Sequence, residues 1–141
     1  MKKIILAAFM AACGLQMSAQ QNLFVAQDLE SAIVNKDNTV TFNFKAPDAQ
    51  KVQIAGDFAE KAEGQHIGGM VGAGLIDMTK NSEGIWTYTT KPLDSELYSY
   101  EFMVDGVPTI DPNNVYVYRD FATTSNVFIV GNGKADLYKV N

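Results

Sequence analysis

The sequence predicts an all-β protein, folded as an antiparallel β-sandwich of about seven strands. From Asn38 onward, apolar residues repeat with a period of two rather than 3.6, and they do so in short runs. Turn residues separate these runs at nearly regular spacing, and little helical patterning follows residue 19. Short strands of this kind favour two stacked antiparallel sheets and exclude a parallel α/β architecture.

The first strand is expected at residues 39–45, where apolar and polar residues alternate strictly. The residues that share its apolar face are Val40, Phe42 and Phe44. Pro47 follows this strand and ends it, because proline cannot donate a hydrogen bond to a neighbouring strand. A second strand begins near Val52 and ends at the Gly-Asp turn that starts with Gly56.

A glycine-rich segment, residues 59–77, interrupts the strands. It contains five glycines among small and apolar residues, too many to hold a helix well, so we expect a mobile loop. His66, the one histidine of the chain, lies in this segment without a serine or cysteine beside it to activate. We therefore expect His66 to be an ordinary exposed loop residue.

The second half of the chain contains the remaining strands. Residues 85–90 are all β-favouring, and the run at residues 98–104 alternates again. The residues that share its apolar face are Tyr98, Tyr100, Phe102 and Val104. The Asp-Gly pair at positions 105–106 predicts a two-residue type I′ hairpin. Two further strands are expected at residues 115–118 and 126–130.

The first residues have the layout of a secretory signal peptide. Lys2 and Lys3 precede the uncharged residues 4–15, and a small-residue cleavage site ends at Ala19. The apolar run is too short to span a bilayer, so we expect an exported protein, periplasmic or extracellular, without membrane insertion. The one cysteine, Cys13, lies in this run, and a surface lipoprotein anchored through Cys13 is the alternative.

We divide the chain into a signal peptide (1–19), an N-terminal extension (20–37) and one sandwich module (38–141). The formal net charge is −5, and no cluster of lysines or arginines offsets it. Nucleic acids and anionic membrane surfaces are excluded as partners, because their phosphates would be repelled.

A search for catalytic motifs returns little. No Gly-x-Ser-x-Gly elbow occurs, and one histidine with one cysteine cannot supply a zinc site. The glycine-rich segment lacks the Lys-Ser/Thr of a phosphate-binding loop. The oxygen-rich residues 111–114 are more simply a turn than a calcium site. A distant carboxylate pair stays open. We expect no enzyme activity, no metal and no cofactor.

Aromatic residues provide the one positive functional signal, because a flat ring stacks on a sugar face while amides bind its hydroxyls. Tyr116 and Tyr118 share a strand face next to Asn113 and Asn114, which makes this group a candidate sugar site. Trp86 is a further candidate ring, although a tryptophan in such a strand more often fills the core.

Three stretches of the chain, residues 42–58, 78–86 and 98–113, keep the order and spacing of a known family. Their motifs are Gly56-Asp57-Phe58, Glu83-Gly84-Ile85-Trp86, Tyr98-Ser99-Tyr100 and Asp105-Gly106. Together they resemble carbohydrate-binding module family 48. The resemblance implies an immunoglobulin-like, early-set β-sandwich and the binding of a polysaccharide or oligosaccharide.

A closer likeness involves residues 21–24, 111–116, 125–130 and 135–138. These stretches look like the N-terminal module of secreted bacterial esterases of the feruloyl or enterochelin type. The likeness implies an α/β-hydrolase esterase domain as a partner. The sequence leaves open whether the chain stands alone or belongs to a longer esterase.

The chain departs from family 48 where the family contacts glycogen or starch. Residues 59–62 replace a polar pair and a stacking tryptophan, and Glu101 replaces a lysine. Val107 and Pro108 stand where a second tryptophan is expected, and only Asn126 survives from the terminal polar contacts. The usual sugar site of the family is therefore largely missing.

Two functions follow from these observations. The first is a non-catalytic accessory module of a secreted esterase-type hydrolase that binds a polysaccharide such as xylan or an α-glucan. Its candidate carbohydrate contacts are Tyr116, Tyr118, Asn113, Asn114, Asn126 and Trp86. The alternative is a structural module that packs against a hydrolase domain without binding sugar itself.

Overall fold

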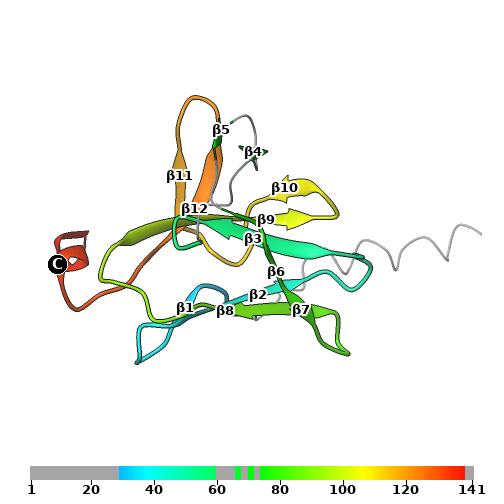
Figure 1. Cartoon of the computed structure of the whole chain (residues 1–141), viewed down its shortest axis with the longest axis horizontal. Coiled ribbons are helices and arrows are strands. Elements are labelled where there is room, and N and C mark those ends of the chain that lie inside the picture. Colours follow the sequence, from blue (N-terminus) through cyan, green and yellow to red (C-terminus); the bar gives the residue numbers. More distant parts are fainter. Residues whose placement is uncertain (1–28, 60–65, 68–69, 72–73, 139–141) are drawn as a thin grey trace, which may run out of the picture.

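A computed structural model describes residues 29–59, 66–67, 70–71 and 74–138 (Figure 1). In these ranges the chain forms two main antiparallel sheets stacked on each other, which confirms the predicted all-β sandwich. The signal peptide, Cys13 and most of the N-terminal extension lie outside the described residues. Among the described residues there is no helix with the length and apolar character needed to cross a membrane.

The smaller sheet forms the lower layer in Figure 1 and has four strands in the order β1-β2-β8-β7. Their bounds are Ile33–Val34 (β1), Val40–Lys45 (β2), Ile85–Thr89 (β8) and Thr79–Lys80 (β7). The two long central strands pair antiparallel with Phe44 opposite Trp86. The predicted strands at residues 39–45 and 85–90 are therefore confirmed to within one residue.

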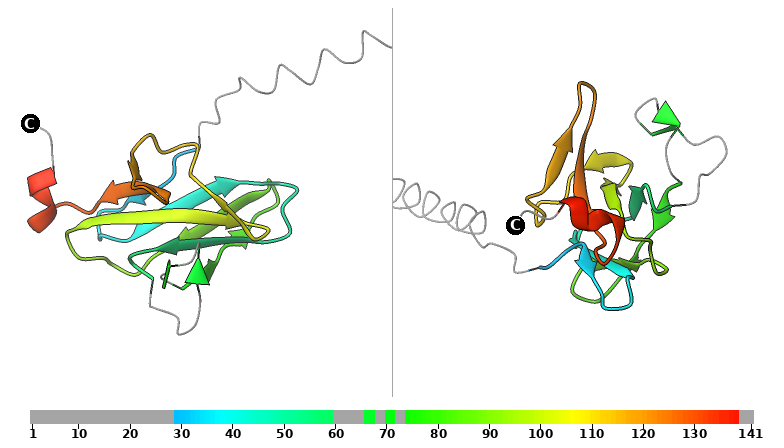
Figure 2. Two further views of the ribbon diagram at one scale, coloured as in Figure 1. Left: turned by 90° about the horizontal axis from the view of Figure 1, so that it is seen from above. Right: turned by 90° about the vertical axis from the view of Figure 1, so that its left-hand side faces the viewer.

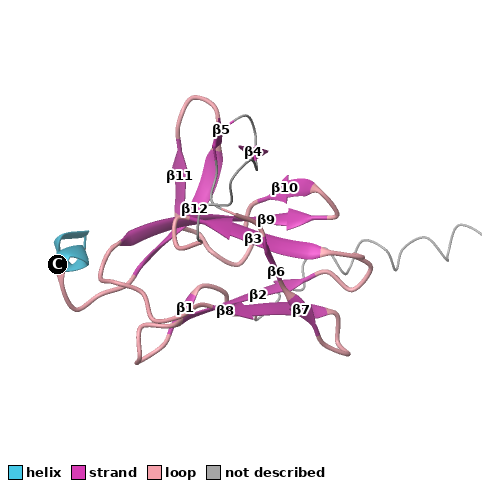
Figure 3. Ribbon diagram, in the orientation of Figure 1, coloured by secondary structure: helices cyan, strands magenta, loops and turns pink. Residues whose placement is uncertain are grey.

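The larger sheet has the order β11-β12-β9-β3-β6, and β10 pairs with β9 outside this path. Its strands are Val52–Gly56 (β3), Ile76–Asp77 (β6), Leu97–Val104 (β9), Val107–Thr109 (β10), Val117–Arg119 (β11) and Thr124–Ile129 (β12). A 3-10 helix, Lys134–Tyr138 (η2), follows at the C-terminal end of the described chain (Figure 3).

The glycine-rich segment corrects one prediction. Instead of a loop throughout, it contains β4 (His66–Ile67) paired with β5 (Met70–Val71), and then β6 on the edge of the larger sheet. His66 therefore lies in a strand. Two-residue strands escape sequence analysis because a period of two cannot be recognised in so few residues. The rest of residues 59–77 lies largely outside the described ranges.

Aromatic rings from both sheets build the core. The ring centroid of Phe42 in β2 lies 4.8 Å from that of Tyr100 and 5.5 Å from that of Phe128 in the facing sheet. The predicted apolar face of β2 is confirmed, because Val40, Phe42 and Phe44 are all buried. Burial of one such ring contributes about 1.5–3 kcal/mol, which makes this cluster the main source of stability.

Trp86 belongs to the same core, with only 7% of its surface exposed. Its indole N–H donates to the carbonyl of Ala46 at 2.9 Å, and the Lys80 ammonium lies 5.3 Å from the ring centroid. A sugar has no access to a ring in this position. The structure therefore removes Trp86 from the candidate sugar contacts and supports its packing role.

Residues in two turns adopt the left-handed backbone conformation. Asp105 (φ 47°) and Gly106 (φ 85°) join β9 to β10 through a two-residue hairpin, as predicted. Gly84 has a φ of 77°, and a Cβ atom there would lie 2.6 Å from Cα of Pro47. A side chain at position 84 would therefore strain the turn between β7 and β8.

Glu101 provides a prediction about pH. Partial burial raises the pKa of its carboxyl, so the folded state binds this proton more tightly than the unfolded state. At a pH below the unfolded-state pKa of this carboxyl, its preference for the proton contributes fully to the stability of the fold. This contribution is lost as the pH rises through the folded-state pKa. We expect Glu101→Gln to raise the free energy of unfolding at pH 7 by at most about 0.5 kcal/mol, since the half-exposed group is screened.

Urea titrations from about pH 3 to about pH 7 test this prediction, and the gain should vanish at the acid end. Glu83→Gln is the matched control, because it removes the same charge from an exposed turn. Equal effects of the two substitutions at every pH would contradict the account.

Candidate binding groove

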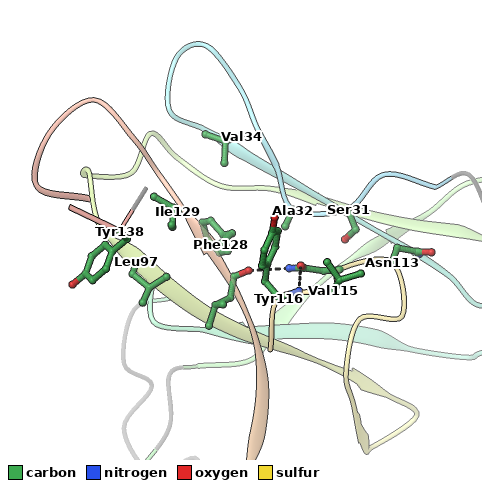
Figure 4. A pocket seen from close by; sticks show the side chains of 12 residues that line it. Ser31, Ala32, Val34, Leu97, Asn113, Val115, Tyr116, Phe128, Ile129 and Tyr138 are labelled. Carbon is green, nitrogen blue, oxygen red and sulfur yellow. Dashed lines mark hydrogen bonds between the residues drawn. The ribbon is translucent and has the colours of Figure 1, made fainter. Parts of the chain in front are cut away.

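A groove of about 760 Å³ lies on one side of the sandwich, between β1 of the smaller sheet and β9 and β12 of the larger one (Figure 4). The residues that line it are Ser31, Ala32, Val34, Leu97, Asn113, Asn114, Val115, Tyr116, Val127, Phe128, Ile129 and Tyr138. In Figure 4, Tyr138 and Leu97 lie toward one end of the groove and Asn113 toward the other, with Tyr116 between them.

A buried polar network holds the loop that forms one wall of the groove, residues 111–116. The side-chain oxygen of Asn126 accepts the N–H of Asp111 at 2.6 Å, and its amide nitrogen donates to the Asn114 carbonyl at 3.0 Å. The same nitrogen donates to the carbonyl of Asp111 at 3.3 Å. One fully buried side chain thus satisfies three backbone groups of this loop.

Asn114 connects the network to the exposed ring. Its amide nitrogen donates to the carbonyl of Val127 at 2.9 Å and to the hydroxyl of Tyr100 at 3.0 Å. Its amide oxygen accepts the backbone N–H of Tyr116 at 2.9 Å. These bonds fix the backbone from which the Tyr116 ring projects.

Tyr100 and Asp111 form the base of the network. The Tyr100 hydroxyl donates to the buried Asp111 carboxylate at 2.7 Å, and that carboxylate also accepts the N–H of Asn113 at 2.8 Å. Burial, with the nearby negative charge of Asp111 as a smaller cause, raises the pKa of Tyr100 far above its usual value. The phenol therefore remains a hydrogen-bond donor at every physiological pH.

The predicted site residues differ in how far they can reach a ligand in the groove. Tyr116, 71% exposed, and the half-buried Asn113 line the groove with accessible side chains. Asn114 lines it too, but its amide is occupied by the bonds described above. Asn126 is fully buried and has no surface to offer a ligand, which corrects its assignment. Tyr118, 59% exposed, lies outside the groove lining.

The amide of Asn113 is the one predicted polar group in the groove whose side chain has no hydrogen-bond partner among the described residues. It provides a donor and an acceptor in the same groove as the exposed Tyr116 ring, toward one end of that groove. Sugar recognition by this ring and this amide stays a prediction.

Sequence reasoning missed Tyr138, which is half exposed and lines the groove from η2. It missed Val34 of β1 in the same way. No periodicity marks either residue, because one lies in a single helical turn and the other in a two-residue strand. Val34 belongs to the smaller sheet and Tyr138 to η2, and only the tertiary structure brings both to the groove.

A hairpin formed by β11 and β12 extends beyond the sandwich (Figure 2). The Asp120 carboxylate closes its turn by accepting the N–H groups of Ala122 and Thr123 at 2.7 and 2.6 Å. The Thr123 backbone bond is the main cause that lowers the pKa of Asp120. Beside this turn, Phe121 is completely exposed.

The hairpin also corrects a strand boundary. The predicted strand at residues 115–118 begins at Val117, because the Asn114 side chain holds the preceding backbone in a turn. Its partner is Thr124–Ile129 instead of residues 126–130.

Within the described ranges, no group of three or more His, Cys, Asp or Glu side chains is placed to hold a metal ion.

Comparison with known proteins yields matches in structure alone. No protein-family model matches the chain, and no curated protein does. The chain is similar to the pullulanase SAP of Group B Streptococcus, solved in complex with maltotetraose, with a TM-score of 0.53 and 17% identity. This match covers 76% of the present chain and 15% of the pullulanase chain.

A second structure of the same pullulanase aligns with a TM-score of 0.53 and 16% identity over 76% of this chain and 15% of that chain. A Paenibacillus barengoltzii pullulanase mutant aligns with a TM-score of 0.47 and 18% identity, covering 72% and 15%. The chain thus spans about 15% of the length of the enzymes it matches. At these identities, the likeness establishes a shared β-sandwich fold.

Proposed function

We propose that the protein is a non-catalytic module of a secreted carbohydrate-active hydrolase and that it binds a polysaccharide in the groove. The observation that carries the proposal is one groove lined both by the exposed ring of Tyr116 and by the amide of Asn113, which has no partner among the described residues. The apolar face of a sugar stacks on such a ring while an amide bonds its hydroxyls. Ligand sites commonly combine an apolar lining with a few polar groups in this way.

The size of the groove supports an oligosaccharide rather than a single sugar. Its volume of about 760 Å³ lies toward the upper end of the range, about 300–1,000 Å³, that is typical of ligand pockets. Tyr138 provides a second half-exposed ring at some distance from Tyr116 along the groove. A glycan segment that lies along the groove would contact both rings.

Two polysaccharide classes are the first to test. An α-glucan is suggested by the fold shared with a pullulanase that was solved with maltotetraose. Xylan is suggested by the resemblance to esterase modules. The proposed site differs from the usual site of family 48, because Glu101, Val107 and Pro108 replace that site's lysine and tryptophan.

The proposal includes the placement of the module. Residues 1–19 would direct export to the periplasm or beyond, 20–37 would form an extension and 38–141 the module. An esterase-type α/β-hydrolase domain is the proposed neighbour. The net charge of −5 makes nucleic acid an unsuitable partner.

Replacing Tyr116 by alanine tests the site. In affinity electrophoresis with xylan, starch or glycogen in the gel, we expect the wild-type protein to be retarded. Tyr116→Ala should weaken binding by about tenfold or more, because truncating an aromatic hot-spot residue costs about 2 kcal/mol or more. The fold should be unaffected, since the ring is exposed.

Tyr118→Ala is the matched control, because it removes a similarly exposed tyrosine two residues away and outside the groove lining. Retardation that survives Tyr116→Ala but not Tyr118→Ala would contradict the proposed site. An absence of retardation on every glycan would contradict the function.

One observation favours a second candidate function, that of packing against a hydrolase domain. Val117, Tyr118 and Phe121 expose apolar surface on the β11–β12 hairpin, outside the groove lining. Exposed apolar surface of this kind marks interaction sites. Under this alternative, no glycan would retard the protein, and Phe121→Ser would weaken its association with the hydrolase domain.

A further inference from the structure

We propose that the groove selects uncharged glycans and rejects those that carry carboxylates. This inference rests on the proposed function and goes beyond it, because neither the fold nor the exposed ring says which glycans are excluded. It depends on the charges in and behind the groove.

The groove lining is electrically neutral. All twelve lining residues are apolar or uncharged polar, and its polar groups are hydroxyls and amides. Among the described residues, the basic residues nearest in sequence to lining residues are Lys36, Arg119 and Lys134, and none of them lines the groove. Lys139, which follows the lining residue Tyr138, lies outside the described residues. A bound carboxylate would therefore find no cationic partner among the described residues that line the groove.

A buried carboxylate lies directly behind one wall. Asp111 accepts the hydroxyl of Tyr100 at 2.7 Å and the backbone N–H of Asn113 at 2.8 Å. Asn113 carries the accessible amide of the site, so a buried negative charge contacts the backbone of the residue that would bond a sugar hydroxyl. The negative net charge of the chain adds to this field.

The free energy of binding in this groove should therefore differ between uncharged glycans and glycans that carry carboxylates. When a neutral sugar stacks on an aromatic ring, only its weakly hydrated apolar face loses contact with water. Its hydroxyls form hydrogen bonds with amides and phenols. A uronic acid would have to give up part of the hydration of its carboxylate beside apolar walls, without an ion pair in return. Repulsion from the buried Asp111 carboxylate adds to this cost, because salt screens buried charges less than exposed ones.

Matched glycans that differ in charge alone test the inference. The first pair is soluble starch and the same starch with part of its primary hydroxyls oxidised to carboxylates. The second pair is glucuronoxylan and the same polymer after reduction of its carboxyls to alcohols. For the polymer class that binds, we expect the neutral member to bind at least about tenfold more tightly.

A substitution that adds a positive charge to the groove provides a second test. Val34→Lys places an ammonium on the rim of the groove, where Val34 is partly exposed in β1. We expect this variant to bind the acidic member at least about threefold more tightly than the wild type does, with little change for the neutral member. Leu97→Lys, at a similarly exposed lining position in β9, serves if Val34→Lys does not fold.

The outcomes distinguish the two proposals. Equal or tighter binding of the acidic member by the wild type would overturn the selectivity and leave glycan binding intact. Binding of neither member of either pair would overturn the proposed function itself, and the selectivity with it. Loss of neutral-glycan binding in Tyr116→Ala would locate the measured affinity in the groove.

Discussion

Replacing Phe42 by alanine is expected to lower the free energy of unfolding by about 4 kcal/mol. Phe42 is fully buried, and its ring contacts those of Phe58, Tyr100 and Phe128, with centroids 4.8 to 5.5 Å away. Alanine would remove the transfer free energy of the ring and leave a cavity that the two stacked sheets cannot close. The loss is a large share of the stability of one domain.

Denaturant unfolding monitored by the fluorescence of Trp86 measures this loss as a lower midpoint at an unchanged slope. Phe121→Ala is the matched control, because that ring is completely exposed at the tip of the β11–β12 hairpin. The control should change stability by no more than about 0.5 kcal/mol. Similar losses in both variants would show that the interior of the sandwich is packed differently.

Asn126→Ala is expected to destabilise the fold by about 3 kcal/mol and to weaken glycan binding as well. The substitution leaves the N–H of Asp111 and the carbonyls of Asp111 and Asn114 without their side-chain partner in a buried position. Each unsatisfied group costs roughly 1–3 kcal/mol, less whatever water can recover.

The effect on binding follows from geometry, because Asn126 touches the loop that positions Tyr116 and Asn113 without itself reaching the groove. Denaturant unfolding and affinity electrophoresis measure the two effects on the same protein. Asn113→Ala supplies the contrast: its side chain has no partner in the described structure, so stability should change by no more than about 0.5 kcal/mol while glycan affinity falls. Wild-type stability in Asn126→Ala would contradict the role of the network.

The site was only partly visible in the sequence. Tyr116 and Asn113 were predicted from a ring and an amide close together in the chain, and both line the groove. Asn126 and Trp86 were predicted by the same chemistry and are buried, because a polar or aromatic residue type does not reveal whether its neighbours are protein or solvent. Burial is decided by the facing sheet.

Long-range placement also decided which residues joined the site. Tyr138 of η2 and Val34 of β1 meet at one groove although more than a hundred positions separate them in the chain. No local sequence pattern predicts such a contact, because the contact depends on the order of strands within each sheet and on how the two sheets stack. The same holds for the network that joins Tyr100 to Asn114 and Asn126.

The sequence by itself determined the local elements of this protein. The strict alternation in β2, and the looser one in β9, placed the apolar faces of both strands in the core, and the Asp-Gly pair specified the hairpin between β9 and β10. These features follow from backbone geometry over a few residues, so a few residues suffice to predict them. Only the tertiary structure decided which rings and amides stay accessible, because that outcome depends on hydrogen bonds and packing between segments far apart in the chain.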